Sequence, residues 1–521
     1  MIWFQVYISV WLSGTSRRHY CRNTAARYDS VLDVVLLSVL LDARVDARNY
    51  GVIADTEEVL MRFSVLFLNV NLAVSLTMGA QVAVASDNEP NLSPRITQDQ
   101  IENDLDLFQA RHEGQRIFST PFNVADGFGD GPINPLDKVS PGGRPTFKNH
   151  GDVLRFNGLD SQTCLECHNL RSTNTIPASF AVGGAGGLSQ SAFPGVIDPD
   201  IDDSENNGYA EIQGRVINPP FVFGSGGVEL VGKEMTQELQ AQKQQAFDNP
   251  NTSVSLEAKD VSFGSISHDG VDFDFSQIEG IGEDLVIRPF GRTGCCATVR
   301  EFDTGAMQFH HGIQPVEVVG VDVDADGDGV ANELLAGELS AMHIFQVSTE
   351  RPRQKHRYFQ TSQERAGADV FDDIGCGDCH VPAMRTNSRF LTLSLPEVMD
   401  DPSANVYYRI NLTRSAPGFK RSGSGVVVPL FADLKLHDMG PDMTEETGNS
   451  LFTTGRLWGI VDTAPYLHDG RALTLSEAIS EHGGEAQANA DAFDALSDSD
   501  REALLAYLGT LRAPRFPNRG L

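Results

Sequence analysis

The stretches Cys164-Leu165-Glu166-Cys167-His168 and Cys376-Gly377-Asp378-Cys379-His380 repeat the pattern C-x-x-C-H in two distant parts of the chain. This pattern is the attachment signal for c-type haem, in which the thiols bond the haem vinyl groups and the histidine ligates the iron. A zinc site would need four clustered ligands, and a thioredoxin-like pair needs no histidine after its second cysteine. The sequence therefore predicts two covalently bound haem c groups, electron transfer, and His168 and His380 as iron ligands.

Two further segments share one sequence pattern, a capping box followed by apolar residues, and each ends in a histidine. Thr474 and Glu477 form a capping box that starts a helix, and the apolar residues that follow place His482 at the end of its buried face. The earlier segment has the same box at Thr298 and a glycine stop after His310 and His311. We expect His482 to be the second axial ligand of haem 2. His310 is expected to lie on the buried stripe, as an axial ligand or pocket residue of haem 1, with His311 turned away. The alternative is a core histidine bonded to a carbonyl.

One acidic stretch has the spacing of a calcium loop, D-x-D-x-D-G-x5-E. Its carboxylates are Asp322, Asp324, Asp326 and Glu333, and Gly327 permits the tight turn. An apolar helix is expected after it, and residues 316–321 before it look extended, so the loop would lack a full helix–loop–helix. The pattern predicts a Ca²⁺ site, and the alternative is an ordinary acidic turn.

The charge of the chain restricts its partners. Among 521 residues, 40 Lys+Arg stand against 71 Asp+Glu, which gives a net charge of −31. Phosphate binding needs a basic surface, so the balance excludes nucleic acid as an expected partner. An acidic surface favours basic partners, such as a small basic cytochrome, although adaptation to salt would produce the same composition.

The first 85 residues resemble a leader rather than a domain. Met61-Arg62 opens an apolar run from Phe63 to Gly79, and Ala83-Val84-Ala85 follows it. A basic start, an apolar centre and an A-x-A site are typical of a secretory signal, with a signal anchor or a core helix as alternatives. We expect residues 1–60 to be an extension from a start assigned too far upstream, residues 61–85 to be the signal peptide, and the mature protein to be periplasmic. No other apolar run is long enough to predict a membrane span.

The periodicity along the rest of the chain favours helices. We expect helices at 101–118, 233–247, 334–347 and 500–511, a small β element within 254–290, and long loops between them. The fold class predicted is mainly α, with two cytochrome c-like domains and a small β insertion. The domains are expected at 86–350 and 351–521.

The C-terminal third resembles a known superfamily. The segment from Phe371 to His380, the string Leu436-His437-Asp438-Met439-Gly440, the segment 463–471 and the helix to His482 are similar to the bacterial di-haem cytochrome c peroxidase and MauG superfamily. The strings at His437, His468 and His482 are closest to its di-haem oxidoreductase, thiol oxidoreductase-like, members. In the peroxidases, the position fourteen residues after the equivalent of His468 ligates the electron-transfer haem, usually as Met, and here it is His482.

Two functions follow from these patterns. One is a periplasmic, peroxidase-like di-haem oxidoreductase that passes electrons between its haems to an acceptor such as peroxide, with His310 as a candidate catalytic residue for proton transfer. The other is a non-catalytic di-haem electron carrier. The expected partners are small redox proteins or a small-molecule oxidant.

Overall fold

The computed structural model describes residues 89–129, 163–166, 168, 196–202, 211–217, 222–398, 403–414, 416–444, 449–468 and 470–515. The chain separates into two compact units, 1–84 and 85–521, and all described residues lie in the second. The expected extension at 1–60, the expected signal peptide at 61–85 and Cys167 lie outside the described residues. Among the described residues, we find no helix with the length and apolar character needed to cross a membrane.

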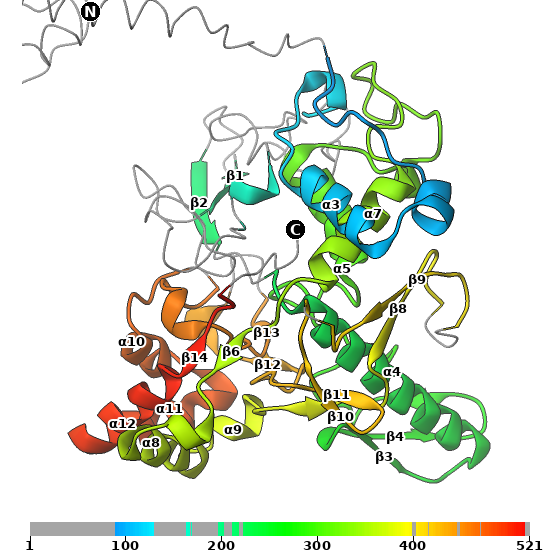
Figure 1. Cartoon of the computed structure of the whole chain (residues 1–521). Coiled ribbons are helices and arrows are strands. Elements are labelled where there is room, and N and C mark those ends of the chain that lie inside the picture. The colour runs from blue at the N-terminus through cyan, green and yellow to red at the C-terminus, as the bar shows by residue number, and fades with distance from the viewer. Residues whose placement is uncertain are drawn as a thin grey trace, which may run out of the picture. The chain divides into compact units, whose positions relative to one another are not determined.

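The first helices of the unit precede and follow the first C-x-x-C-H motif (Figure 1). They are η1 (Gln100–Asp104), α3 (Leu107–Phe118), η2 (Val124–Asp126), η4 (Cys164–Glu166), α4 (Ser225–Asp248), α5 (Val299–Ala306), η5 (Met307–His311), α6 (Val316–Val319) and α7 (Ala336–Val347). Asp106 caps α3 through the backbone N–H of Gln109. The α6 turn shows that 316–321 is not wholly extended. Helix α4 begins eight residues before the expected Lys233, in a glycine-containing stretch of low helix propensity.

The later helices surround the second motif. They are η6 (Arg357–Phe359), α8 (Ser362–Asp373), α9 (Cys376–Cys379), η7 (Pro441–Met443), η8 (Ile460–Asp462), α10 (Leu475–Ser480), η9 (Gly484–Ala486), α11 (Gln487–Asp494) and α12 (Asp498–Leu508). The expected capping box is present, because Thr474 accepts from the N–H of Glu477 while the Glu477 carboxylate accepts from that of Thr474.

The described residues hold more β structure than the mainly α expectation allowed. The strands are β1 (Val196–Asp202), β2 (Glu211–Ile217), β3 (Val254–Ala258), β4 (Val261–His268), β5 (Phe273–Asp274), β6 (Arg353–Gln354), β7 (Met384–Arg385), β8 (Phe390–Ser394), β9 (Val406–Asn411), β10 (Lys420–Ser422), β11 (Gly425–Val428), β12 (Leu436–Asp438), β13 (Leu451–Thr453) and β14 (Leu511–Arg512). They form separate antiparallel sheets of two or three strands, and β3–β4–β5 is the expected insertion. The fold is mixed, because short strands also connect the helices between 384 and 453.

Two helix pairs pack through a glycine, one pair in each half of the described chain. Gly114 in α3 faces α7 so closely that a Cβ there would clash with the carbonyl oxygen of Ala341. Gly367 in α8 faces α12 in the same way, against the carbonyl oxygen of Ala503. Figure 1 shows both crossings. In each half, a helix that precedes the C-x-x-C-H motif therefore packs on the backbone of one that follows it.

The hydrophobic core does not divide at residue 350. The main cluster contains buried side chains from Leu92 to Val347 and also many from Met384 to Trp458. A second cluster joins α8, α11 and α12 through Phe371, Phe493 and Leu504. The strands at 384–434 thus share their core with the first half of the chain, while α8, α11 and α12 form a core of their own.

Candidate haem sites

A cavity of about 370 Å³ lies at the second C-x-x-C-H motif. Cys376, Cys379 and His380 line it on one side, and His482 lines it as well. Most of its other lining residues are apolar, among them Phe371, Leu475, Ile479, Leu504 and Leu508. Apolar walls with a few convergent polar groups are typical of a cofactor site.

His380 and His482 face one another with their ring centroids 6.3 Å apart. A metal–imidazole bond is about 2 Å long and the ring centroid lies about 1 Å behind the bonded nitrogen, so two imidazoles on opposite sides of one metal have centroids about 6 Å apart. The observed separation has room for one iron between the rings. His482, which the sequence predicts as the second ligand, therefore lines the same cavity as His380.

Both rings use the same nitrogen, Nδ1, in a hydrogen bond to a backbone carbonyl. His380 Nδ1 lies 3.1 Å from the carbonyl oxygen of Phe431, and His482 Nδ1 lies 2.8 Å from that of Ala478. Because a carbonyl oxygen only accepts, each Nδ1 carries the proton and the lone pair of the neutral ring is on Nε2. Burial, helped by the neighbouring His482, lowers the pKa of His380 to about 4, which keeps that ring neutral. A metal-ligating histidine commonly uses its second nitrogen in this way, so the carbonyl bond does not reduce His482 to a core histidine.

The thiols of the motif do not resemble those of a thioredoxin pair. Burial raises the pKa of Cys376 to about 11. Redox-active and metal-binding cysteines are thiolates whose pKa is lowered by their surroundings. The raised pKa of Cys376 is unlike that of a reactive thioredoxin-type thiolate and is compatible with thioether attachment.

Arg456 lines the same cavity and has a buried donor without an acceptor. Its Nη1 donates to the carbonyl oxygen of Pro289, whereas its Nε is buried with no hydrogen-bond partner. A buried unpaired donor is costly and calls for an anionic acceptor in the site. Haem carries carboxylate side chains that could accept from it, so the residues present fit the group that the motif implies.

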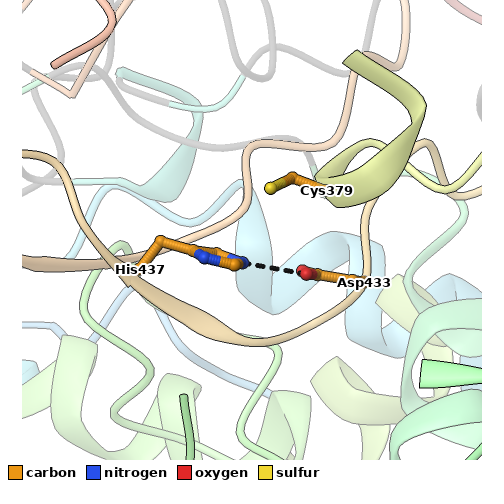
Figure 2. A group of neighbouring side chains, drawn as sticks. All are labelled: Cys379, Asp433 and His437. Carbon is orange, nitrogen blue, oxygen red and sulfur yellow. Dashed lines mark hydrogen bonds and ion pairs between the residues drawn. The ribbon is translucent and has the colours of Figure 1, made fainter. Parts of the chain in front are cut away.

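His437, which also lines the cavity, pairs with the carboxylates of Asp433 and Glu485, and Figure 2 shows its contact with Asp433. Its Nε2 lies 2.8 Å from Asp433 Oδ2, and its Nδ1 lies 2.8 Å from Glu485 Oε2. Burial lowers the pKa of His437, but the hydrogen bonds to Asp433, Cys379 and Glu485 and the charge of Asp433 outweigh burial and raise it to about 11. His437 is therefore an imidazolium at neutral pH.

The group Cys379, Asp433 and His437 is close enough to suggest a metal ion. An imidazolium has no lone pair to offer, however, and Cys379 belongs to the haem attachment motif. The group is better explained as an ion-pair cluster that fixes the strand β12 beside the motif. Sequence reasoning missed Asp433 and Glu485, although Glu485 follows His482 in one of the strings that carry the family resemblance.

At the first motif, the structure describes Cys164, Leu165, Glu166 and His168. The backbone N–H of His168 donates to the carbonyl oxygen of Cys164 at 2.8 Å, and the His168 ring lies 6.5 Å from that of Phe118. The motif thus begins with a helical turn and lies against the end of α3.

The two histidines after α5 lie in the opposite order to that expected. His311 is 2% exposed, its Nε2 lies 3.8 Å from Cys164 Sγ, and its ring packs on Phe122. His310 is only half-buried. The expectation that His311 turns away is wrong, because the helix changes at Met307 from α to π and thereby shifts the inward face.

The carboxylates of the expected calcium loop are only partly brought together. Asp324 and Asp326 lie close to one another and to Asp328. Asp322 instead pairs with Asn332, with both hydrogen bonds at 2.8 Å. Glu333 is 1% exposed and accepts from the N–H of Gln314.

These features are those expected of a haem-binding site in the C-terminal half of the chain. Residues 421–511 match the profile of the family described as "Di-haem oxidoreductase, putative peroxidase". The match confirms the resemblance to this family in the part of the chain that carries His437, His468 and His482, and it supports a haem-based redox role. None of the curated proteins compared matches the chain.

Two solved structures show weak similarity. One is the hydrazine synthase of Kuenenia stuttgartiensis pressurised with xenon, at 16% identity and a TM-score of 0.24, covering 53% of this chain and 87% of that one. The other is a MauG-like protein associated with microbial copper homeostasis, at 16% identity and a TM-score of 0.25, covering 57% of this chain and 93% of that one. Neither TM-score supports a conclusion about this protein.

Proposed function

We propose that the protein is a periplasmic, peroxidase-like di-haem c-type oxidoreductase. Cys164, Cys167 and His168 hold haem 1, and Cys376, Cys379 and His380 hold haem 2, with His482 as the second ligand of its iron. Haem supplies one-electron chemistry when bound, and the protein sets its ligation, access and potential. The periplasmic location rests on the export signal expected at residues 61–85.

The observation that carries the proposal is the facing pair His380 and His482 in the cavity of the second motif. The two ring centroids are 6.3 Å apart, and each ring uses Nδ1 in a hydrogen bond to a backbone carbonyl, which leaves Nε2 as the proposed ligand atom. With both axial positions taken by histidines, this half serves electron transfer rather than substrate binding. An acceptor such as peroxide would then be reduced in the N-terminal half, where His310 is the candidate for proton transfer.

The partners follow from charge. With a net charge of −31, the chain attracts basic proteins, so a small basic cytochrome is the proposed electron donor. The association should weaken as ionic strength rises.

A non-catalytic electron carrier is the second candidate, and one observation favours it. His311 is buried with Nε2 near Cys164, so it is placed to ligate the iron of haem 1. If it does, both irons would be closed by protein ligands and no position would be left for peroxide.

Replacing His482 tests the ligand assignment. A thioether in place of an imidazole raises a haem potential, so His482→Met should shift one of two potentials upward and leave the other nearly unchanged. Redox titration with near-infrared spectroscopy measures both the shift and the band of sulfur ligation. If His482→Ala leaves both haems low-spin with unchanged potentials, the assignment fails and Met439, which lines the same cavity, is the next ligand to examine.

Spectra of the resting and half-reduced protein distinguish enzyme from carrier. A high-spin signal that peroxide alters in the native protein supports the oxidoreductase. A wholly low-spin native protein in which only His311→Ala introduces a high-spin signal supports the carrier. His112→Ala, at an exposed position of α3, is the control.

A further inference from the structure

Three carboxylates converge in the turn that follows α6. Oxygen atoms of Asp324, Asp326 and Asp328 lie within 4.8 Å of one another. Like charges at this distance repel, and Asp326 is only 8% exposed, so water screens it poorly. The arrangement is unfavourable unless a cation or protons balance the charge.

The backbone wraps around one of these carboxylates. Asp324 accepts from the N–H groups of Gly327, at 2.7 Å, and Gly329, at 3.1 Å. Both glycines have positive φ, 78° and 95°, which lets the chain turn sharply at each. The turn holds the three aspartates on one side.

Glu333 supplies an independent sign of a missing ligand. Its side chain is 1% exposed, and Oε2 accepts from the N–H of Gln314 at 2.7 Å. Its other oxygen, Oε1, is buried without a hydrogen-bond partner. The carboxylates of Asp324, Asp326 and Asp328 lie close enough to act on Glu333 electrostatically. A buried carboxylate oxygen with no donor, beside three more carboxylates, is what a cation would satisfy.

We propose that Asp324, Asp326, Asp328 and Glu333 bind one Ca²⁺ ion. The set contains only oxygen donors, which hard cations prefer, and it lacks the His and Cys that zinc or copper would select. Several carboxylates in a flexible loop suit Ca²⁺ better than Mg²⁺, which keeps most of its waters.

The site differs in register from the loop pattern in the sequence. That pattern uses the side chain of Asp322 at its first position and the backbone carbonyl of Asp328 at its seventh. In the structure the Asp322 side chain pairs with Asn332, and the Asp328 carboxylate joins the cluster. The two registers therefore make opposite predictions for Asp322 and Asp328.

The cation would stabilise the segment that carries His311. Gln314, whose N–H donates to Glu333, also accepts through Oε1 from Gln308 in η5 at 3.1 Å. Binding at Glu333 thus restrains both ends of the turn from Gln308 to Gln314. The relevance of this restraint to haem 1 rests on the proposed function, whereas the cation site itself does not.

The test compares single variants of the full chain stripped with a chelator and titrated with CaCl₂. The wild type should bind Ca²⁺ and unfold at a higher temperature with it. Asp328→Ala should weaken binding by about tenfold or more, since even outer-shell losses cost 10–100-fold, and Asp322→Ala should leave it nearly unchanged. The reverse result would overturn this register, and unchanged binding in both would overturn the site.

Glu333→Gln distinguishes loss of Ca²⁺ binding from a failure of the variant to fold. It keeps the shape of the side chain and removes a buried charge, so the chelated protein should be at least as stable as the chelated wild type. It should nevertheless lose the stabilisation by Ca²⁺. Hydrogen exchange at the Gln314 amide gives a readout independent of haem: Ca²⁺ should slow it in the wild type and not in Glu333→Gln, and equal protection in both would contradict the proposal.

Discussion

His380 and His482, which line the cavity of the second motif, show how single hydrogen bonds decide the chemistry of a side chain. The Nδ1–H of His380 donates to the carbonyl oxygen of Phe431, and the Nδ1–H of His482 donates to the carbonyl oxygen of Ala478. These bonds fix the ring orientation as well as the tautomer, because the acceptors are part of the backbone. If the two rings bind iron as proposed, they would be oriented before the iron is bound, which would reduce the cost of ordering them.

Asp303 is a buried acid in the helix before η5. It is 4% exposed and accepts from Gln346 Nε2 at 2.6 Å. Burial raises its pKa to about 7, although the bond from Gln346 and the charge of Arg300 oppose the rise. The folded chain thus holds this proton more tightly than the unfolded chain.

This proton makes stability depend on pH. For an acid whose folded pKa exceeds its unfolded value, the free energy of unfolding falls as pH rises from about 4 to about 7 and then levels off. Asp303→Asn removes this titration. The free energy of unfolding of the variant, relative to that of the wild type, should therefore rise by about 1–3 kcal/mol across this pH window. Urea unfolding at pH 4.5, 6 and 8 measures the difference. Asp272→Asn, at an exposed position, is the control, and a pH-independent difference for Asp303→Asn would contradict the assignment.

At the scale of elements, corresponding pieces recur in each half. A glycine-packed helix comes before each C-x-x-C-H motif, and a capped helix ending near a histidine comes after it. The halves differ where α5 continues as the π-helix η5, whereas α10 ends at Ser480. This difference places His311, rather than His310, against the first motif.

The glycine contacts predict a sharp response to one methyl group. Gly114→Ala and Gly367→Ala would each place a Cβ against a carbonyl oxygen of the facing helix. The helices must separate, and we expect each variant to lose about 1–3 kcal/mol or more of unfolding free energy. Gly305→Ala in α5 is the matched control, because nothing lies within 4 Å of its Cβ, and it should gain about 0.5–1 kcal/mol. Thermal and urea unfolding measure all three, and equal effects would show that the close approach is not limiting.

Local signals in the sequence predicted the helices better than they predicted the contacts between them. The capping box at Thr474 and the N-cap at Thr298 could be predicted because capping involves residues three apart, although the Glu301 carboxylate accepts from the N–H of Ala297 rather than from that of Thr298. The π-helical turn was not predictable, since hydrophobic spacing does not distinguish i+4 from i+5 bonding. The pairing of His437 with Glu485 joins residues 48 positions apart, and it could not be predicted without the fold.

At the scale of the whole described unit, the hydrophobic core does not follow the order of the chain. The sequence suggested one domain on each side of residue 350. The strands β7, β8, β9 and β11 come after that point, yet their buried side chains belong to the main core with α4 and α7. The alternation Leu391-Thr392-Leu393-Ser394 in β8 predicts a strand, but it does not show which core that strand joins.

The shared core predicts that the chain does not divide at residue 350. The segment 351–521 contributes at least six fully buried aliphatic side chains to the main core: Leu391, Leu393, Ile410, Leu412, Val426 and Val428. Exposing them would cost on the order of 10 kcal/mol, at about 1.5–3 kcal/mol each, which is comparable to the whole stability of a typical domain. Expressed alone, fragments 86–350 and 351–521 should therefore lack cooperative unfolding by near-ultraviolet circular dichroism, whereas the co-expressed pair should associate and recover it. A fragment 351–521 that unfolds cooperatively alone would show instead that the cluster around Phe371 and Leu504 is a sufficient core, and that the strands merely dock on the first half.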